Sequence, residues 1–591
     1  MDSTRKDFKF DWVEYSTVAM MLLFSVMIGI YYTFFKKQDT YTEYMLGGKK
    51  MGVFPVSMSL VASFISGITL MGVPVEIYVY GTQYMISNIA NIIVFSVTGI
   101  FYLPVYYKLQ LNSVFEYLEL RFSRTVRIMG SLMYSTTLIL YLPVVMYVPA
   151  LAFNQVTDVP VHVITPIICI SCLFYTAFGG LKAVLWTDAL QNTFMFLAVI
   201  FILVLGCNRV GGIQEILRIT REGSRLEFFN LDPSPFTRNT FWNVILGNMF
   251  IFLTNIAANP GSVQRFLSVP SLKKARLVLL VSCIGFYAIN NLAMCLGLVL
   301  YARYHGCDPV AAGMIKSHTQ MMPLYVMEVG KDYPGLAGLF MSGVLSAALS
   351  TMSSWLNTVG GTLYKDIKEV FFPNVEHSES KQSTIIKIII LVLGALVVAL
   401  VAVVESLGTV LQVANSLLGI MYGSFLALFT VGIFIPRVNN KGAICGTIAS
   451  LVLTGWIVFN AQYAVLQGKL RFPGKITSID ECPRSVIDHY YSNVSLLFNY
   501  TGYGSPVIAD MSTPVIYKLS YWYYIVLGSL TGIVVGFIVS LLTSSPDITS
   551  LNPDLFSPYV FRLTHEKHSD QCNQEFQLSN RDKTEHIHEA L

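Results

Sequence analysis

The chain has 591 residues, of which 54% are hydrophobic and only 13% are charged, and its mean hydropathy is +0.58. Soluble domains carry about 25% charged residues, so this composition excludes a water-exposed globule and predicts an all-α polytopic membrane protein. The net charge of +4 comes from basic residues scattered along the chain and gives no indication of nucleic-acid binding.

Apolar stretches long enough to cross a bilayer recur along the chain, since a membrane helix needs about 20 residues. We expect about thirteen, at 15–35, 52–80, 83–107, 128–153, 161–179, 189–207, 240–258, 277–302, 334–364, 385–404, 409–436, 442–463 and 519–543. Residues 15–543 then form one transmembrane domain. The charged segment 1–14 is expected as an extracellular N-terminus without a signal peptide, and the polar segment 544–591 as a cytoplasmic tail.

The distribution of basic residues predicts the orientation, because cytoplasmic loops are enriched in lysine and arginine. With the N-terminus outside, the inner loops hold Lys36, Lys37, Lys49, Lys50, Lys108, Arg121, Arg124, Arg127, Lys182, Arg265, Lys273, Lys274, Arg276, Arg437 and Lys441. The loop 208–239 is expected outside but is also basic, which conflicts with this rule.

The long loop 464–518 between the last two spans supports the same orientation. It carries two glycosylation sequons, at Asn493 and Asn499, and we therefore expect it to be extracellular. Cys307 and Cys482 lie in predicted outer loops and are candidates for a disulfide, with two unpaired thiols as the alternative.

A polar stripe runs through the apolar segment 342–358. Its members recur at spacings of three and four and so share one helical face: Ser342, Ser346, Ser350, Ser353, Ser354 and Asn357. Hydroxyl and backbone oxygens at this depth can coordinate a cation such as sodium, whereas the alternative is that small residues let helices pack closely.

Two spans have the features of broken helices. Span 52–80 carries hydroxyl side chains and is interrupted by Gly67, Gly72 and Pro74. Span 240–258 is rich in asparagine and ends in Asn259-Pro260-Gly261. Interrupted helices at corresponding positions of two halves are typical of inverted-repeat transporters, here with repeats 52–207 and 240–436.

Asp188 follows a pair of glycines where the chain re-enters the membrane, and its alternatives are a functional acid or an interfacial side chain. The sequence has no phosphate-binding glycine loop and no nucleophile or metal-ligand constellation in a polar domain. We therefore expect no enzyme, but a carrier that works by alternating access. A channel-like or solute-sensing protein with the same fold is the alternative.

Six motifs, at 72–81, 113–122, 179–191, 238–242, 263–268 and 349–354, occur in order along the chain. Through them the chain resembles the sodium/solute symporters of the solute carrier 5 type, and most closely the branch of sodium-coupled monocarboxylate, multivitamin and iodide transporters. The resemblance spans about 15–543. It implies a LeuT-like five-plus-five inverted repeat preceded by one extra helix.

The resemblance also implies a set of site residues. The sodium ligands carried over from the family are Ala62, Ile65, Ser350, Ser353 and Ser354, with Asp188 associated with a second sodium. The substrate cavity would be lined by Phe64, Ser66, Thr69, Trp242 and Gln412. Ser342 and Ser346 have no ligand role in relatives and are expected to pack.

Several departures from the family pattern bear on the inner gate, at 259–262, and on the substrate. The segment 259–262 differs from close relatives, and Thr69 stands where iodide-handling relatives carry a longer amide. The sequence also shows no obvious arginine or lysine at cavity depth.

The expected function is sodium-driven symport of a small organic anion, such as a monocarboxylate, biotin or pantothenate, at the plasma membrane; iodide or sugar are the alternative solutes. The expected partners are sodium as co-substrate, the anionic solute and membrane lipid, without nucleic acid or an obligatory protein partner.

Overall fold

The computed structural model describes residues 10–560, apart from positions 37, 39, 112, 316, 373, 376, 408–409, 473, 484–507, 510–513 and 549–550. This part of the chain is almost entirely helical. The strands found in it are two short ones, β1 (Leu470–Arg471) and β2 (Ile508–Ala509), which pair antiparallel with Leu470 opposite Ala509. The glycosylation candidates Asn493 and Asn499 lie outside the described residues.

The helices follow the apolar stretches of the sequence. They are α2 (Trp12–Phe34), α3 (Tyr41–Leu46), α4 (Val53–Phe64), α5 (Gly67–Tyr80), α6 (Ser87–Val97), α7 (Leu103–Lys108), α8 (Val114–Arg121), α9 (Arg124–Thr157), α10 (Val161–Val210), α11 (Ile213–Glu222), α12 (Phe241–Leu253), α13 (Pro260–Leu267), α14 (Leu272–Tyr304), α15 (Met321–Gly330), α16 (Leu336–Phe371), α17 (Glu379–Leu407), α18 (Val410–Phe434), α19 (Asn440–Leu466) and α21 (Trp522–Leu542). Short turns of 3₁₀ or π-helix join them: η1 (Gly47–Lys49), η2 (Thr82–Ile86), η3 (Thr98–Tyr102), η4 (Thr254–Ala258), η5 (His318–Gln320), η6 (Val515–Lys518) and η8 (Pro553–Leu555).

Fewer helices qualify as membrane spans by length and composition, among the described residues, than the thirteen expected. Among the described residues, 10 helices qualify, or 11 if the bent pair α4–α5 counts as one span. Part of the difference lies in α10, whose 50 residues contain both stretches 161–179 and 189–207. Such a helix would measure about 75 Å, far more than the roughly 30 Å bilayer core. The all-α polytopic fold is confirmed, and the number thirteen remains a prediction.

Gly180 breaks α10 between those two stretches. Its backbone has φ +58° and ψ −164°, a conformation that glycine adopts without strain and L side chains rarely adopt. A β-carbon there would lie 2.9 Å from the ring of Tyr44, so the close approach of α3 also requires glycine.

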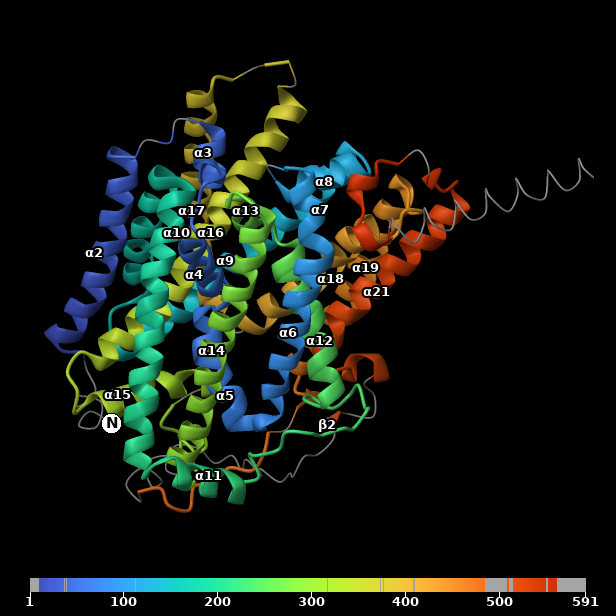
Figure 1. Cartoon of the computed structure of the whole chain (residues 1–591). Coiled ribbons are helices and arrows are strands. Elements are labelled where there is room, and N and C mark those ends of the chain that lie inside the picture. Colours follow the sequence, from blue (N-terminus) through green and yellow to red (C-terminus); the bar gives the residue numbers. More distant parts are fainter. Residues whose placement is uncertain are drawn as a thin grey trace, which may run out of the picture.

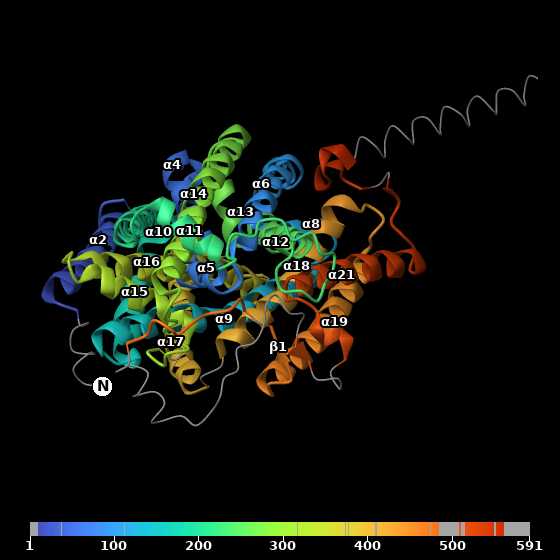
Figure 2. The same cartoon turned by 90° about the horizontal axis from the view of Figure 1, so that it is seen from below.

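The helices form a central bundle with a separate group at one side. In Figures 1 and 2, α18, α19 and α21 lie together, while α2 and α10 lie toward the opposite side. Helices α3 and α8 are at one end of the bundle, and α11, α15 and β2 are at the other. For α16, 94% of the most apolar window is buried, compared with 22% for α2. The polar stripe of the sequence therefore lies on the most enclosed helix.

The first broken helix is the pair α4 and α5, which meet at an angle of 51°. Ile65 and Ser66 have extended backbones, and Ser66 caps α5 by accepting the N–H of Thr69 at 3.2 Å. The break therefore lies at 65–66 and not at Gly72 or Pro74, both of which lie within α5. A serine cap explains this position, because its side chain replaces the missing backbone partner of the new helix.

The second broken helix runs from α12 through the π-turn η4 to α13. Asn259 has an extended backbone and caps α13 by accepting the N–H of Gly261 at 2.8 Å. Pro260 follows as the first helical residue, where its missing N–H costs nothing. The sequence Asn-Pro-Gly thus ends one half-helix and starts the next.

One end of the bundle carries the disulfide between Cys307 and Cys482, whose Cα atoms are 4.9 Å apart. The loop 208–239 lies at this end, and four of its five arginines have side-chain contacts within the described residues: Arg209, Arg218, Arg225 and Arg238. Arg238 pairs with Glu76 at 3.1 Å and lies 4.2 Å from the ring centre of Tyr80. These contacts explain why the loop is basic without being on the lysine-rich side of the molecule.

The opposite end is held by ion pairs around Arg127 on α9. Its guanidinium contacts Glu119 at 2.5 Å, Asp366 at 3.2 Å and Glu369 at 2.6 Å. Because Glu119 belongs to α8 and the other two acids to α16, one arginine joins three helices at this end.

Candidate functional site

The end of α4 and the middle of α16 face one another through hydroxyl groups. Ser63 Oγ lies 3.4 Å from Ser350 Oγ and 3.2 Å from Ser354 Oγ. Ala62 and Ile65, two of the residues expected as sodium ligands, flank Ser63 and are buried. The structure therefore places the α4 and α16 members of the expected sodium set at one helix junction, beside the break in the first broken helix.

Two hydroxyls of the polar stripe donate hydrogen bonds within their own helix, α16. Ser353 Oγ donates to the carbonyl of Ser350 at 3.1 Å, and Ser354 Oγ donates to the same carbonyl at 2.6 Å. A hydroxyl that bonds a carbonyl through its hydrogen keeps its oxygen lone pairs for a second partner. Ser353 and Ser354 therefore retain the capacity to ligate a cation in this arrangement.

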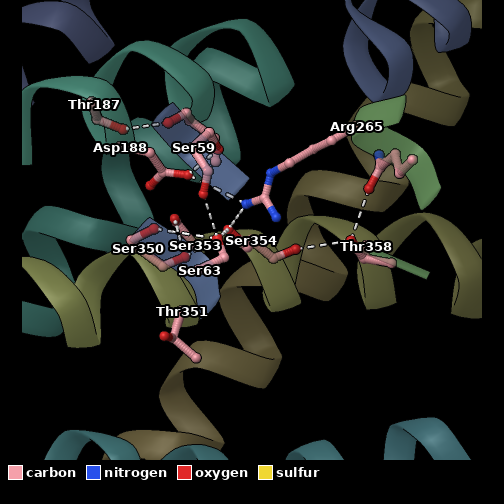
Figure 3. Close-up of polar contacts among 12 residues, drawn as sticks. Ser59, Ser63, Thr187, Asp188, Arg265, Ser350, Thr351, Ser353, Ser354 and Thr358 are labelled. Atoms are coloured by element: carbon pink, nitrogen blue, oxygen red, sulfur yellow. Dashed lines mark hydrogen bonds and ion pairs between the residues drawn. The ribbon is translucent and has the colours of Figure 1, made fainter. Parts of the chain in front are cut away.

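Asp188 lies at the same junction, on α10, and is fully buried. Its Oδ2 accepts from Ser59 Oγ at 2.5 Å and from Arg265 Nη2 at 3.3 Å. Figure 3 shows Asp188, Ser59, Arg265 and the α16 serines converging from four helices. The side chain is buried within the protein, which argues against an interfacial side chain, and its function stays a prediction.

Arg265 corrects two expectations. It was counted with the inner-loop cations, and no arginine was expected at cavity depth, yet only 3% of its side chain is exposed. Its Nη2 also donates to Ser354 Oγ. The reason is that 260–267 forms a buried half-helix after the break and is not a loop. The apolar spacing of Val263, Phe266 and Leu267 signals such a helix.

The half-helix α13 is fixed to its surroundings by a second polar side chain. Gln264 Nε2 donates to the carbonyl of Met45 at 2.5 Å, and Gln264 Oε1 accepts from Thr358 Oγ1 at 2.8 Å. Arg265 and Gln264 thus connect α13 to two turns of α16. Any movement of α13 must exchange these contacts.

Two charged atoms in the cluster have no hydrogen-bond partner within the described residues. They are Asp188 Oδ1 and Arg265 Nε. Buried polar atoms are normally paired, since leaving one unpaired costs about 1–3 kcal/mol and more for charged groups. Asp188 can therefore accept one more donor or cation, and a sodium ion at its carboxylate would compete with the guanidinium of Arg265.

The expected substrate residues are only partly brought together. Ser66 and Thr69 lie at the cap of α5, and Phe64 lies one turn earlier with its ring edge-on to Phe95 and Phe286. Trp242 is 47% exposed at the start of α12, because the buried face of that helix carries Asn243, Gly247 and Asn248 instead. Gln412 belongs to α18, and its side chain lies outside the described residues.

The second broken helix contributes polar groups that the sequence did not assign. Tyr134 Oη on α9 donates to Asn259 Oδ1 at 3.4 Å, and Ser262 Oγ donates to the carbonyl of Asn255 at 2.7 Å. The asparagine run was the signal for these contacts. It places amides at a mid-membrane helix break, where polar groups are tolerated only if they have partners or line a cavity.

Two broken helices packed against a buried carboxylate and a hydroxyl-lined helix define a secondary transporter that couples its solute to a cation. A model of the sodium:solute symporter family matches residues 44–450. The chain belongs to the sodium:solute symporter family, with sodium as its co-substrate, and this family consists of multi-pass membrane transporters rather than enzymes.

Named relatives extend the match over most of the chain. The human sodium-coupled monocarboxylate transporter 1 is 35% identical over 550 residues, covering 92% of this chain and 89% of its own length. A putative sodium-dependent multivitamin transporter of Drosophila melanogaster is 34% identical, covering 93% and 91%. A solved structure of a Na⁺-coupled sialic acid symporter has a TM-score of 0.73 at 23% identity, covering 91% of this chain and 100% of its own, and shares the fold.

Proposed function

We propose that the chain takes up a small organic anion, a monocarboxylate or a vitamin such as biotin or pantothenate, together with sodium. The observation that carries the proposal is the similarity to sodium-coupled monocarboxylate transporters over nine-tenths of the chain. Alternating access at the plasma membrane would move both solutes inward.

The sodium site in this proposal comprises Ala62 and Ile65 with Ser350, Ser353 and Ser354. The contacts of Ser63 with α16 support it, because they hold the carbonyl end of α4 against the serines. Asp188 would serve a second cation. Its unpaired Oδ1 supports this role, and Arg265 would hold the carboxylate while the cation is absent.

The substrate would occupy the space beside the broken helices, next to Phe64, Ser66, Thr69 and Gln412. Trp242 is a weaker candidate because it lies half exposed at the start of α12. The N-terminus would be outside and the C-terminus cytoplasmic, with 52–207 and 240–436 as the two repeats. The disulfide supports this orientation, since structural disulfides form in oxidising compartments.

The experiment that tests the proposal is uptake of labelled butyrate by cells that lack endogenous transport, with sodium or choline in the medium. We expect sodium-dependent uptake that is competed by lactate, biotin or pantothenate. Competition by iodide or glucose alone, or a current that does not saturate with substrate, would contradict the proposed substrate class or the carrier mechanism.

A further inference from the structure

A polar cavity lies at the end of the molecule that carries the disulfide, away from the breaks in the two broken helices. It has a volume of about 910 Å³, which is in the range of small-molecule sites. Figure 2 looks onto this end, where α11 and α12 lie near one another. The polar and cationic lining residues that bear on its chemistry are Gln83, Arg221, Arg225, Arg238, His305 and Lys475.

Some of the charges at the cavity are already neutralised. The ion pairs there are Lys475–Glu227 at 2.8 Å, Arg238–Glu76 at 3.1 Å and Glu222–Arg218 at 2.8 Å. Arg221 and Arg225 are left over. Within the part of the chain that the structure describes, neither has a carboxylate at ion-pair distance. The lining therefore has two cations without counter-ions.

Arg225 supplies a buried positive charge. It is 1% exposed, and its three nitrogens donate at 2.8 Å to the carbonyls of Tyr78, Gly223 and Ile476. Burial lowers its pKa, because the charged form loses its solvation. A counter-anion in the cavity would stabilise this charge.

One buried acid, Asp308, acts on Arg225. Its carboxylate accepts the hydroxyl of Tyr78 at 2.8 Å and the N–H groups of Val310 and Ala311 at 2.8 Å each. These donors fix Asp308 to its own turn. These donors are neutral, so Asp308 keeps its charge and partly compensates Arg225, whereas Arg221 keeps its full positive charge.

Gln83 gives an independent indication of a ligand. It is 3% exposed, its Oε1 accepts the N–H of Asn230 at 3.0 Å, and its Nε2 has no acceptor among the described residues. A buried amide donor without an acceptor is rare, and this one belongs to the cavity lining. The missing partner must be an acceptor, and the surrounding charge favours an anionic one.

We propose that this outer cavity binds a small organic carboxylate, with Gln83 and Arg221 as its donors and Arg225 as the source of attraction. The choice of a carboxylate rests on the proposed function. Binding here requires no sodium, because the cations are part of the protein. The cavity would raise the local concentration of substrate on the outer side before it reaches the central site.

The test is saturation-transfer difference NMR of butyrate with the purified full-length protein in sodium-free choline buffer at low ionic strength. We expect a saturable signal from the wild-type protein. Arg221→Gln should lower the apparent affinity for butyrate about tenfold, equivalent to about 1.4 kcal/mol. Gln83→Glu should do the same, since it keeps the acceptor for Asn230 and repels an anion. Lys469→Gln is the control: it removes an exposed cation at the same end of the molecule, outside the cavity lining, and should bind as the wild type does.

A signal unchanged in both cavity variants, or equal for butyramide, would overturn the proposal. Displacement by chloride as effectively as by propionate would overturn the carboxylate assignment. Ser353→Ala separates this site from the proposed function: it should lose sodium-dependent uptake affinity yet retain the sodium-free signal. Loss of uptake by wild type with a retained, Arg221-dependent signal would contradict the proposed function alone.

Discussion

Ser353 is the residue that tests the main sodium site. Ser353→Ala removes a hydroxyl ligand worth about 1–1.5 kcal/mol, so we expect the sodium concentration for half-maximal butyrate uptake to rise about five- to tenfold. Thr351→Ala is the matched control. Thr351 bonds the carbonyl of Ala347 at 2.9 Å and points away from the cluster in Figure 3. An unchanged value in Ser353→Ala would remove it from the site.

Asp188 and Arg265 form a buried pair, and removing one partner leaves an uncompensated charge. Each single variant, Asp188→Asn or Arg265→Gln, should cost about 3–5 kcal/mol of stability. The double variant should recover much of it, because both charges are gone. The measurement is the unfolding temperature of the purified protein in detergent. If the loss in the double variant equals the sum of the two single losses, the pair is not coupled.

Asp188→Asn also tests the second cation. If the carboxylate binds sodium, the inward current evoked by butyrate at saturating sodium should fall relative to uptake in Asp188→Asn, and in the double variant as well. If the charge moved per butyrate is the same in both variants as in the wild type, Asp188 has only a structural role.

The polar stripe and the contacts of Asp188 differ in how far the sequence predicts them. The stripe at 350–354 predicted the hydroxyl face correctly, because helical spacing fixes which residues share a side. It could not predict that Ser59 and Arg265 meet Asp188, since these contacts join segments far apart in the sequence. A buried acid needs a partner, but the sequence does not say which one.

At the scale of elements, we expect transport to depend on the helix caps at the two breaks. Ser66→Ala and Asn259→Ala each remove a cap worth about 0.5–2 kcal/mol, and we expect lower butyrate uptake at equal surface expression. Ser271→Ala removes the cap of α14, where Ser271 accepts the N–H of Lys274 at 3.3 Å, and serves as the control. Equal losses in all three variants would indicate general destabilisation instead of a role for the breaks.

The same caps show why element boundaries were harder to predict than the elements. The break in the second broken helix followed from Asn259-Pro260, whose chemistry is local. The sequence predicts interruptions at Gly67, Gly72 and Pro74. The break lies at 65–66, directly before Gly67, where a serine side chain caps the helix, and Gly72 and Pro74 lie within α5. Proline within α5 is compatible with a helix that packs tightly on its neighbours, and packing is not visible in a single segment.

The orientation of the whole molecule is tested by its glycans. Asn493 and Asn499 should carry them if the loop 464–518 is extracellular. Glycosidase treatment of the wild-type protein should lower its apparent mass, and the double variant Asn493→Gln/Asn499→Gln should migrate like the treated protein. A wild-type protein that is insensitive to the glycosidase would contradict the proposed orientation.

Stoichiometry determines how far the whole molecule can drive its solute. One sodium with one monovalent anion moves no net charge, whereas two sodium ions move one charge. That charge gains about 2.3 kcal/mol per 100 mV, equivalent to more than tenfold in accumulation. The presence of Asp188 beside the proposed main site favours the second case.

The central claim is that sodium drives the solute uphill. Purified protein in liposomes, with equal butyrate on both sides and an inward sodium gradient, should accumulate labelled butyrate above equilibrium. An inside-negative potential should increase that accumulation, and choline in place of sodium should abolish it. Equilibration that never exceeds the external concentration, at a rate independent of sodium, would contradict the account.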